Sequence, residues 1–485
     1  MTPAPFTARQ KRNAVIGVLL AMFLATLDQT IVAPALPTIG ARLGDADFLP
    51  WIVTAYLLTS TAVTPLYGKV SDIYGRQPVL FLALGIFVLG SIICALAGSM
   101  AALIIGRAVQ GLGGGGLITL AQTVIADVVS PRERSKFVVY ISTVWAVSSI
   151  SGPALGGVLA GRLSWTLMFW INLPLAALAA LISWRTLRGA PQVLRDHRLD
   201  LLGSLLITLA TLGFMLALTL GGERIAWTSP ALLGLLAASL LLGAWLYAHL
   251  KRSAHPLIPL SLFRNEVVGM ATLAIFFAMF AFIGATVYLP IYFEYVLRVD
   301  PTFAGVGLVA LLGGSVIGAN STGRYMPRVA HYKQMATYGL IVAFGALLLL
   351  ALLAPRLNYW GAEALVLALG IGIGPLFPTA TVCVQNAVDP RDLGIATATL
   401  AFLRTLGSAV GVALLGAILL GYRVIADNGA PPQAIDAELV ARAAQAFSVI
   451  FAVQAAMVAL SFFFYWRMEE RPLRGPSAAT ASAEL

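Results

Sequence analysis

Charged residues are scarce in this sequence. Only 11% of its 485 residues are Asp, Glu, Lys or Arg, whereas soluble domains contain about 25%. Hydrophobic residues make up 59% of the chain, and no stretch is long and polar enough to form a soluble enzyme domain. We therefore expect an all-α integral membrane protein built from spans of about 20 apolar residues each.

Cysteine is also rare, since the chain contains only Cys94 and Cys383. Both lie in apolar runs that we place in different helices, so we expect free thiols and no disulfide framework. The sequence lacks the phosphate-binding pattern G-x-x-x-x-G-K-[ST], and we expect that ATP does not drive the protein. The four histidines are expected at the surface, namely His197, His249, His255 and His331. Without a nucleophile–base or metal-ligand cluster, the sequence indicates neither an enzyme nor a bound metal or cofactor.

The apolar runs predict fourteen membrane-spanning helices. Their approximate limits are 14–36, 51–70, 79–98, 101–127, 137–160, 165–185, 200–220, 230–250, 267–291, 303–323, 334–354, 361–385, 393–421 and 446–466. Residues Met1–Arg12 lack the small-residue cleavage site of a signal peptide, so the first run is expected to stay as a helix. Polar connections divide the helices into an N-terminal six-helix bundle in residues 1–185, a linker with two accessory helices in 186–266, and a C-terminal six-helix bundle in 267–485.

The positions of basic residues predict which side each loop faces. With a cytoplasmic N-terminus, the cytoplasmic connections and tails hold about 22 of the 31 Lys and Arg residues, and the opposite loops hold about 7. The remaining two, Arg107 and Arg404, lie inside spans. This bias places both termini in the cytoplasm and explains the net charge of +10 without a nucleic-acid partner. In the long outer loop, residues 434–447 form either a short amphipathic surface helix or part of a disordered loop.

Asp28 lies inside the first apolar run. Placing an ionised carboxylate at such a depth costs about 2.5–3.5 kcal/mol on insertion scales. Asp28 is therefore either a proton or cation site that faces an internal cavity, or a neutral side chain that only helps helix packing.

Arg107, in the fourth span, is the candidate partner of Asp28. A helix rises about 1.5 Å per residue, which puts both side chains at about 10 Å from the outer side. We expect the two to pair directly or through Gln110, or else Arg107 to cap backbone carbonyls. The glycines that follow, Gly111–Gly116 with one Leu, allow a neighbouring helix to approach closely.

The turn between the second and third spans carries a dense pattern of glycines and charges, Gly68-Lys69-Val70-Ser71-Asp72-Ile73-Tyr74-Gly75-Arg76-Gln77. Gly68 and Gly75 allow close approach and turning, and Asp72 and Arg76 can form a charge network. Asp127, at the cytoplasmic end of the fourth span, either joins this network or is solvated.

The fifth span contains Gly152, Pro153, Gly156 and Gly157. Proline removes a helix hydrogen bond and glycine removes bulk, so this helix is expected to kink and to pack tightly.

These motifs resemble those of one transporter family. The Gly68–Gln77 turn resembles the hallmark loop of the major facilitator superfamily, and the fifth span resembles the antiporter motif of its exporters. Two further stretches, Leu27–Pro37 and Trp165–Pro174, resemble motifs of its fourteen-helix drug:proton antiporters. The sequence departs from the usual pattern at Gln77, where Arg or Lys is frequent, and at Ala33, where Asn is frequent.

The resemblance implies roles for several of these residues. In this family the hallmark loop stabilises the outward-open state, and Asp72 would contact the start of the equivalent helix in the other half, near Leu393 and Gly394. The glycines, Pro153 and Asp127 would take part in the conformational cycle. An intramembrane arginine such as Arg107 is associated with proton transfer in the family.

The candidate substrate site remains open at the sequence level. Tyr288, Tyr292 and Glu294 form either a cation-attracting outer mouth or an interfacial aromatic belt, and Glu294 is also a candidate for proton coupling together with Asp28 and Arg107. Arg404 either binds an anionic group or neutralises a dipole. Tyr56, Gln110, Trp145 and Asn172, together with Tyr288 and Asp28, are candidates for lining the cavity, and the alternative for each aromatic or amide side chain is core packing or lipid contact.

The resemblance implies a proton-coupled antiporter that exports hydrophobic or cationic drug-like compounds by alternating access and so contributes to antibiotic resistance. It would work as a monomer in the cytoplasmic membrane of a bacterium, driven by the proton gradient and without a cofactor. An exporter of a lipid, siderophore or metabolite, or a proton-coupled importer, is the alternative.

Overall fold

A computed structural model describes residues 8–44, 48–129, 131–187, 199–222, 225–253, 255–299, 307–326, 331–424 and 437–473. Within these ranges the chain is helical, apart from turns and one isolated bridge between Gly221 and Ile225. The all-α prediction is confirmed for the described part of the chain.

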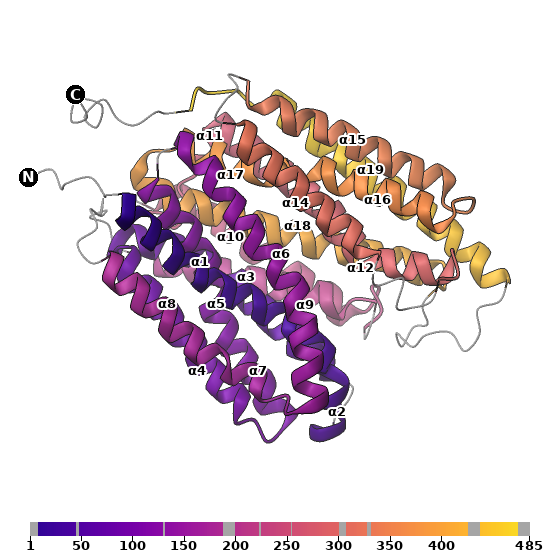
Figure 1. The fold of residues 1–485 in the computed structure, drawn as a ribbon, viewed down its shortest axis with the longest axis horizontal. Helices are drawn as coiled ribbons and strands as arrows, with labels where there is room; N and C mark the ends of the chain where they lie inside the picture. The colour runs from indigo at the N-terminus through magenta and orange to yellow at the C-terminus, as the bar shows by residue number, and fades with distance from the viewer. Residues whose placement is uncertain are drawn as a thin grey trace, which may run out of the picture.

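The first helices in the chain pack together as one group (Figure 1). Their bounds are α1 (Ala8–Ile31), the 3₁₀ helix η1 (Ala33–Ala35), α2 (Leu36–Leu43), α3 (Leu49–Tyr74), α4 (Arg76–Ala95), α5 (Met100–Val128), α6 (Pro131–Arg162), α7 (Leu167–Trp170) and α8 (Asn172–Leu187). We refer to this group as the N-terminal bundle.

Two helices follow, α9 (Leu201–Leu220) and α10 (Pro230–Arg252), and a short turn α11 (Ser261–Arg264). The last group of helices, which we call the C-terminal bundle, comprises α12 (Glu266–Tyr295), α14 (Leu308–Tyr325), α15 (Lys333–Leu353), α16 (Tyr359–Ile373), α17 (Leu376–Ala387), the 3₁₀ helix η3 (Pro390–Asp392), α18 (Leu393–Gly421) and α19 (Ala437–Arg467). The start of α1 and the end of α19 lie at the same end of the molecule (Figure 1).

The described ranges contain fourteen long helical segments when α7 with α8, and α16 with α17, are each taken as one. Eleven of these are long and apolar enough to cross a membrane, which makes this a multi-pass membrane protein. The other three segments are α3, α6 and α14, through which the two bundles touch, α3 with α18 and α6 with α14.

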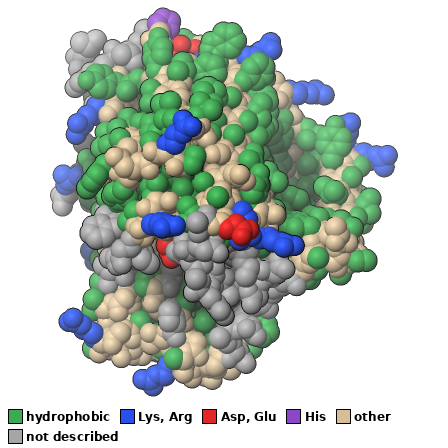
Figure 2. All heavy atoms as spheres, turned by 90° about the vertical axis from the view of Figure 1, so that its right-hand side faces the viewer, with side chains coloured by type: hydrophobic (Ala, Val, Ile, Leu, Met, Phe, Trp, Pro, Cys, Tyr) green, Lys and Arg blue, Asp and Glu red, His purple; other side chains and the backbone are tan. Residues whose placement is uncertain are grey.

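The outer surface fits a lipid environment. Large apolar side chains are exposed on several helices, including Leu241 and Trp245 on α10 and Leu352 on α15. Figure 2 shows one face of the molecule, on which hydrophobic side chains dominate and Lys and Arg are few. In a bilayer, lipid tails would cover this apolar surface and keep it out of water.

Two of the helix limits predicted from the sequence are wrong, and prolines explain both differences. The first span was expected to reach residue 36, but α1 ends at Ile31 and η1 and α2 follow. Pro34 and Pro37 lack a backbone N–H and disfavour the helical conformation of the residue before them. Similarly, the twelfth span divides into α16 and α17 at Gly374–Pro375.

The last helix also differs from the expectation. Residues 437–447 belong to α19, which runs without a break from Ala437 to Arg467. The separate amphipathic surface helix expected at 434–447 is therefore wrong over these residues, and residues 434–436 lie outside the described part of the chain.

Apolar packing differs between the two bundles. The described C-terminal bundle has one continuous hydrophobic core. The N-terminal bundle has two, one around Met22, Phe87 and Leu120 and the other around Ile31, Leu103 and Phe169. Between these two cores, α1, α4 and α5 carry the buried polar side chains Asp28, Ser91, Arg107 and Gln110, which form the site described next.

Candidate functional site

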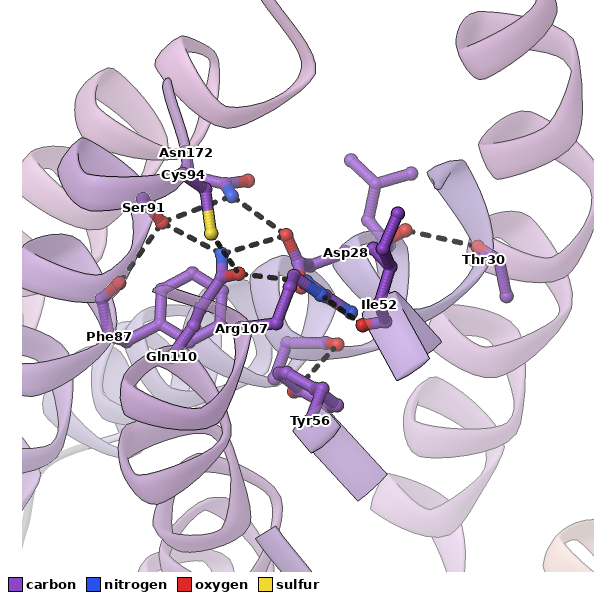
Figure 3. Close-up of polar contacts among 12 residues, drawn as sticks. Asp28, Thr30, Ile52, Tyr56, Phe87, Ser91, Cys94, Arg107, Gln110 and Asn172 are labelled. Carbon is purple, nitrogen blue, oxygen red and sulfur yellow. Dashed lines mark hydrogen bonds and ion pairs between the residues drawn. The ribbon is translucent and has the colours of Figure 1, made fainter. Parts of the chain in front are cut away.

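Asp28 sits in the last turn of α1, and its side chain is completely buried. Its Oδ2 forms an ion pair with Nη1 of Arg107 on α5. Its Oδ1 accepts hydrogen bonds from Nε2 of Gln110 at 2.8 Å and from Nδ2 of Asn172 at 2.9 Å (Figure 3). Both carboxylate oxygens are thus occupied by donors from α5 and α8.

Arg107 is held on several sides. Its Nε donates to the carbonyl oxygen of Ile52 at 3.0 Å, and its Nη1 also donates to Oε1 of Gln110 at 2.7 Å. The guanidinium lies 4.5 Å from the centroid of the Tyr56 ring, and both side chains are buried. The pair therefore contributes no net charge to the interior, because the two opposite charges are in direct contact.

Ser91 and Cys94 of α4 complete the network, and the sequence-based site did not include them. Ser91 Oγ accepts from Gln110 at 2.8 Å and from Asn172 at 3.3 Å, and donates to the Phe87 carbonyl at 3.0 Å. The Cys94 thiol lies 3.9 Å from Gln110 Oε1. Gly90 makes this approach possible, since a Cβ at that position would overlap the backbone of Gln110.

Asn172 reaches Asp28 because the helix is broken just before it. The turn α7 ends at Trp170 and α8 begins at Asn172, so the amide stands at the first position of a helix. Its side chain is buried between the two hydrophobic cores of the N-terminal bundle. The structure thus brings together Asp28, Arg107, Gln110, Asn172 and Tyr56, all of which are sequence-predicted site residues.

The segment of α1 around Asp28 also forms hydrogen bonds and close packing contacts with α6. Thr26 Oγ1 lies 2.8 Å from Ser148 Oγ, and Thr30 Oγ1 donates to the Ser148 carbonyl at 2.9 Å. Cβ atoms at Gly152 and Gly156 would overlap Thr30 and the Ile31 carbonyl, respectively. Two of the predicted glycines therefore pack tightly, while Gly157 faces open space and the side chain of Pro153 lies outside the described part of the chain.

A second charged cluster joins the bundles at the end where α3 meets α18. Asp72 accepts hydrogen bonds from the backbone N–H groups of Gly394 at 3.1 Å and Ile395 at 2.9 Å, in the first turn of α18. The positive end of the helix dipole faces this carboxylate. The contact expected between Asp72 and the helix start near Leu393 and Gly394 is present.

Arg76 links this cluster to α5. Its Nη1 donates to Asp72 at 2.5 Å and to Ser71 Oγ at 2.7 Å, and its Nε donates to Asp127 at 2.8 Å. Asp127 therefore belongs to the network, although it keeps about a third of its side chain exposed.

Both glycines of the turn have a steric reason to be glycine. Gly75 has φ 93°, which side chains disfavour. A Cβ at Gly68 would overlap Ala398 and the Gly394 carbonyl. The two bundles are thus in backbone contact at this end.

The remaining predicted residues lie outside both clusters. Tyr292 is fully buried among Phe293, Phe447 and Phe451 and donates to the Ala354 carbonyl at 2.9 Å. Tyr288 donates to the Val412 carbonyl at 2.6 Å. Glu294 is half-buried near the end of α12.

Arg404 of α18 and Trp145 of α6 meet across the two bundles. The guanidinium lies 5.8 Å from the centroid of the indole ring, and both side chains are half-buried. The structure therefore brings together two predicted substrate-site residues from opposite halves of the chain.

Residues 18–412 match the sequence profile described as Major Facilitator Superfamily. The chain is 31% identical over 412 residues to the multidrug transporter protein MdtP of Bacillus subtilis, covering 85% of this chain and 76% of the relative. It is 31% identical over 414 residues to multidrug resistance protein 3 of the same organism, covering 85% and 80%. It is 34% identical over 420 residues to the efflux pump dotC of Dothistroma septosporum, covering 82% and 69%.

Two solved structures share the fold. The human organic anion transporter MFSD10 superposes with a TM-score of 0.66 at 18% identity, covering 94% of this chain and 99% of that one. A bacterial homologue of the iron transporter ferroportin, in an outward-facing state, superposes with a TM-score of 0.67 at 12% identity, covering 96% and 100%. At these identities the likeness shows the fold alone.

Proposed function

The chain belongs to the major facilitator superfamily, and from this premise we propose that it is a proton-coupled exporter of hydrophobic or cationic drug-like compounds. It is a transporter and not an enzyme. The multidrug and efflux names of relatives at 31–34% identity support export of small molecules.

One observation carries the proton-coupling part of the proposal, namely the buried Asp28–Arg107 pair between two hydrophobic cores. An ionisable side chain within a membrane is costly, and such residues mark ion pathways and proton relays. In the proposed cycle a proton from outside binds Asp28, and Arg107 then loses its counter-charge. The arrangement of α1, α5 and α8 that stabilises the ion pair is then no longer the most stable one. Protonation of Asp28 therefore changes the relative populations of the outward-facing and inward-facing conformations.

The positions of the termini and of the basic residues support an orientation of the protein in the membrane. We place the Asp72 end in the cytoplasm together with both termini, because the start of α1 and the end of α19 lie at one end of the molecule and the basic residues follow the positive-inside rule. The contact of α3 with α18 at that end supports the proposal that this arrangement is the outward-facing one. Protons from outside then have the shorter route to Asp28.

The proposal is tested with purified protein in liposomes. An imposed pH gradient should drive uphill transport of a hydrophobic rhodamine dye, and a protonophore should abolish it. Dye addition should in turn move protons in the opposite direction, which a pH-sensitive dye trapped inside the liposomes reports. Dye movement that persists unchanged without a pH gradient, and that moves no protons, would contradict the proposal.

A further inference from the structure

The bundles separate along α18 just before Arg404. All residues from 393 to 401 of α18 are buried, whereas all residues from 402 to 406 are half-buried. Beyond this point the glycines Gly407 and Gly411 keep α18 against α12, since Cβ atoms there would overlap the carbonyl oxygens of Phe276 and Phe280. At Arg404, α18 therefore still packs against the C-terminal bundle, but the N-terminal bundle no longer buries it.

Arg404 has no counter-charge among the described residues. No carboxylate in the ranges that the structure describes forms an ion pair with it, and its backbone carbonyl, not its guanidinium, bonds Ser408 Oγ at 3.0 Å. The three carboxylates described in the N-terminal bundle have other partners, since Asp28 is held by Arg107, Gln110 and Asn172, and Asp72 and Asp127 pair with Arg76. Within the described ranges, no carboxylate thus balances the positive charge of Arg404 between the bundles.

An unbalanced arginine within a membrane is costly, and such residues mark binding sites and ion pathways. The contact with Trp145 leaves the Arg404 guanidinium able to donate hydrogen bonds. The indole ring engages the guanidinium at 5.8 Å through the π face. A cation–π contact of this kind does not use up the hydrogen-bonding capacity of the guanidinium, which has five N–H donors, so Arg404 can still bind a carboxylate with two parallel hydrogen bonds.

From this geometry we infer that Arg404 and Trp145 form a subsite for the acidic group of an amphipathic cargo. The carboxylate binds the edge of Arg404, and the hydrophobic body packs against the Trp145 ring. The inference rests on the proposed export function and narrows its substrate class to hydrophobic compounds that carry a carboxylate, including zwitterions. Because α18 and α6 belong to different bundles, such a cargo also neutralises the charge at the point where the halves must approach.

The test uses rhodamine B, which carries a carboxylate, and its ethyl ester, in which that carboxylate is replaced by an uncharged ester group. Binding to the detergent-solubilised protein is measured by fluorescence anisotropy, and transport is measured separately in liposomes. The wild type should bind the acid more tightly than the ester. Arg404→Gln should weaken binding of the acid about 10-fold or more, as expected for loss of a hydrogen-bonded charge pair, while binding of the ester changes little.

Two further variants separate charge recognition from folding. Arg404→Lys keeps the charge and should retain most of the preference for the acid. Ser408→Ala, one turn along α18, should leave the preference unchanged. Equal weakening of both dyes by Arg404→Gln, or a wild type that does not prefer the acid, overturns the inference. Preferential binding without proton-driven transport would leave this subsite standing and contradict the export proposal instead.

Discussion

Gly156 of α6 lies directly against the carbonyl oxygen of Ile31, the residue at which α1 ends. One turn earlier, Gly152 lies against Thr30, and both contacts are within one turn of Asp28. The glycines of the fifth span therefore do more than allow a bend. They set the position of the α1 segment that carries the buried carboxylate, because any larger residue would push that segment away.

Two neighbouring glycines provide a matched test of this role. Gly156→Ala should destabilise the protein by about 1–3 kcal/mol through overpacking and should reduce proton-coupled transport. Gly157→Ala should be neutral or slightly stabilising, because a Cβ there meets nothing within 4 Å and alanine favours helix. Thermal unfolding in detergent and liposome transport measure the two effects. Equal behaviour of the two variants would show that the contact with Ile31 has no special role.

Asp72→Asn should loosen the contact between the bundles without removing the cargo site. The variant exchanges charge-assisted hydrogen bonds to Gly394 and Ile395 for neutral ones, and a bond to a charged group contributes about 1.5–3 kcal/mol. We expect a smaller outward-facing population and slower transport. Spin labels on the ends of α3 and α18 report the distance distribution by pulsed electron paramagnetic resonance. Loss of dye binding in the same variant would argue against a purely conformational role.

The sequence was sufficient to find the residues whose chemistry is unusual in a membrane. Asp28 and Arg107 stand out because ionised groups in apolar runs are rare, and the fixed helical rise places them at one depth. The partner of Asp72 at the start of α18 came from the family resemblance, since residues more than 300 positions apart share no local pattern. Gln110 lies three residues after Arg107 on α5, so its place in the network follows from the same helix, whereas Asn172 comes from α8 and was predicted only as a candidate for lining the cavity.

The rest of the network has no sequence signal. Arg107 donates a hydrogen bond to the backbone carbonyl of Ile52, and every residue type has this group. Ser91 and Cys94 are small residues within a long apolar helix, where nothing in the hydropathy distinguishes a network member from a packing residue. The end of α1 was misplaced because hydropathy continues past Ile31, while the prolines at 34 and 37 decide the backbone.

Asp28→Asn should abolish transport driven by a pH gradient, because an amide cannot release a proton. It should also destabilise the protein, since removing one partner of a buried ion pair costs about 3–5 kcal/mol. The double variant Asp28→Asn with Arg107→Gln removes both charges and should recover much of the stability without recovering transport. Thermal unfolding of the single and double variants measures the coupling between the two residues. Gradient-driven transport by Asp28→Asn would exclude this carboxylate as the coupling site.

Asn172→Leu should slow proton-coupled transport and destabilise the protein. In the wild type Asn172 donates to the same carboxylate oxygen of Asp28 as Gln110 does, and a hydrogen bond to a charged group contributes about 1.5–3 kcal/mol. Without the amide, Asp28 loses one of its three donors, and the start of α8 is no longer bonded to α1. Initial transport rates in liposomes and thermal unfolding measure the two effects.

Ser91→Ala is the control for this loss. Ser91 accepts hydrogen bonds from both amides, and its described bonds do not include Asp28, so its removal should slow transport less than Asn172→Leu does. The same transport and unfolding measurements are made on both variants. If the two variants slow transport equally, the hydrogen bond from Asn172 to Asp28 has no special role in coupling, and the amide only supports packing at the start of α8.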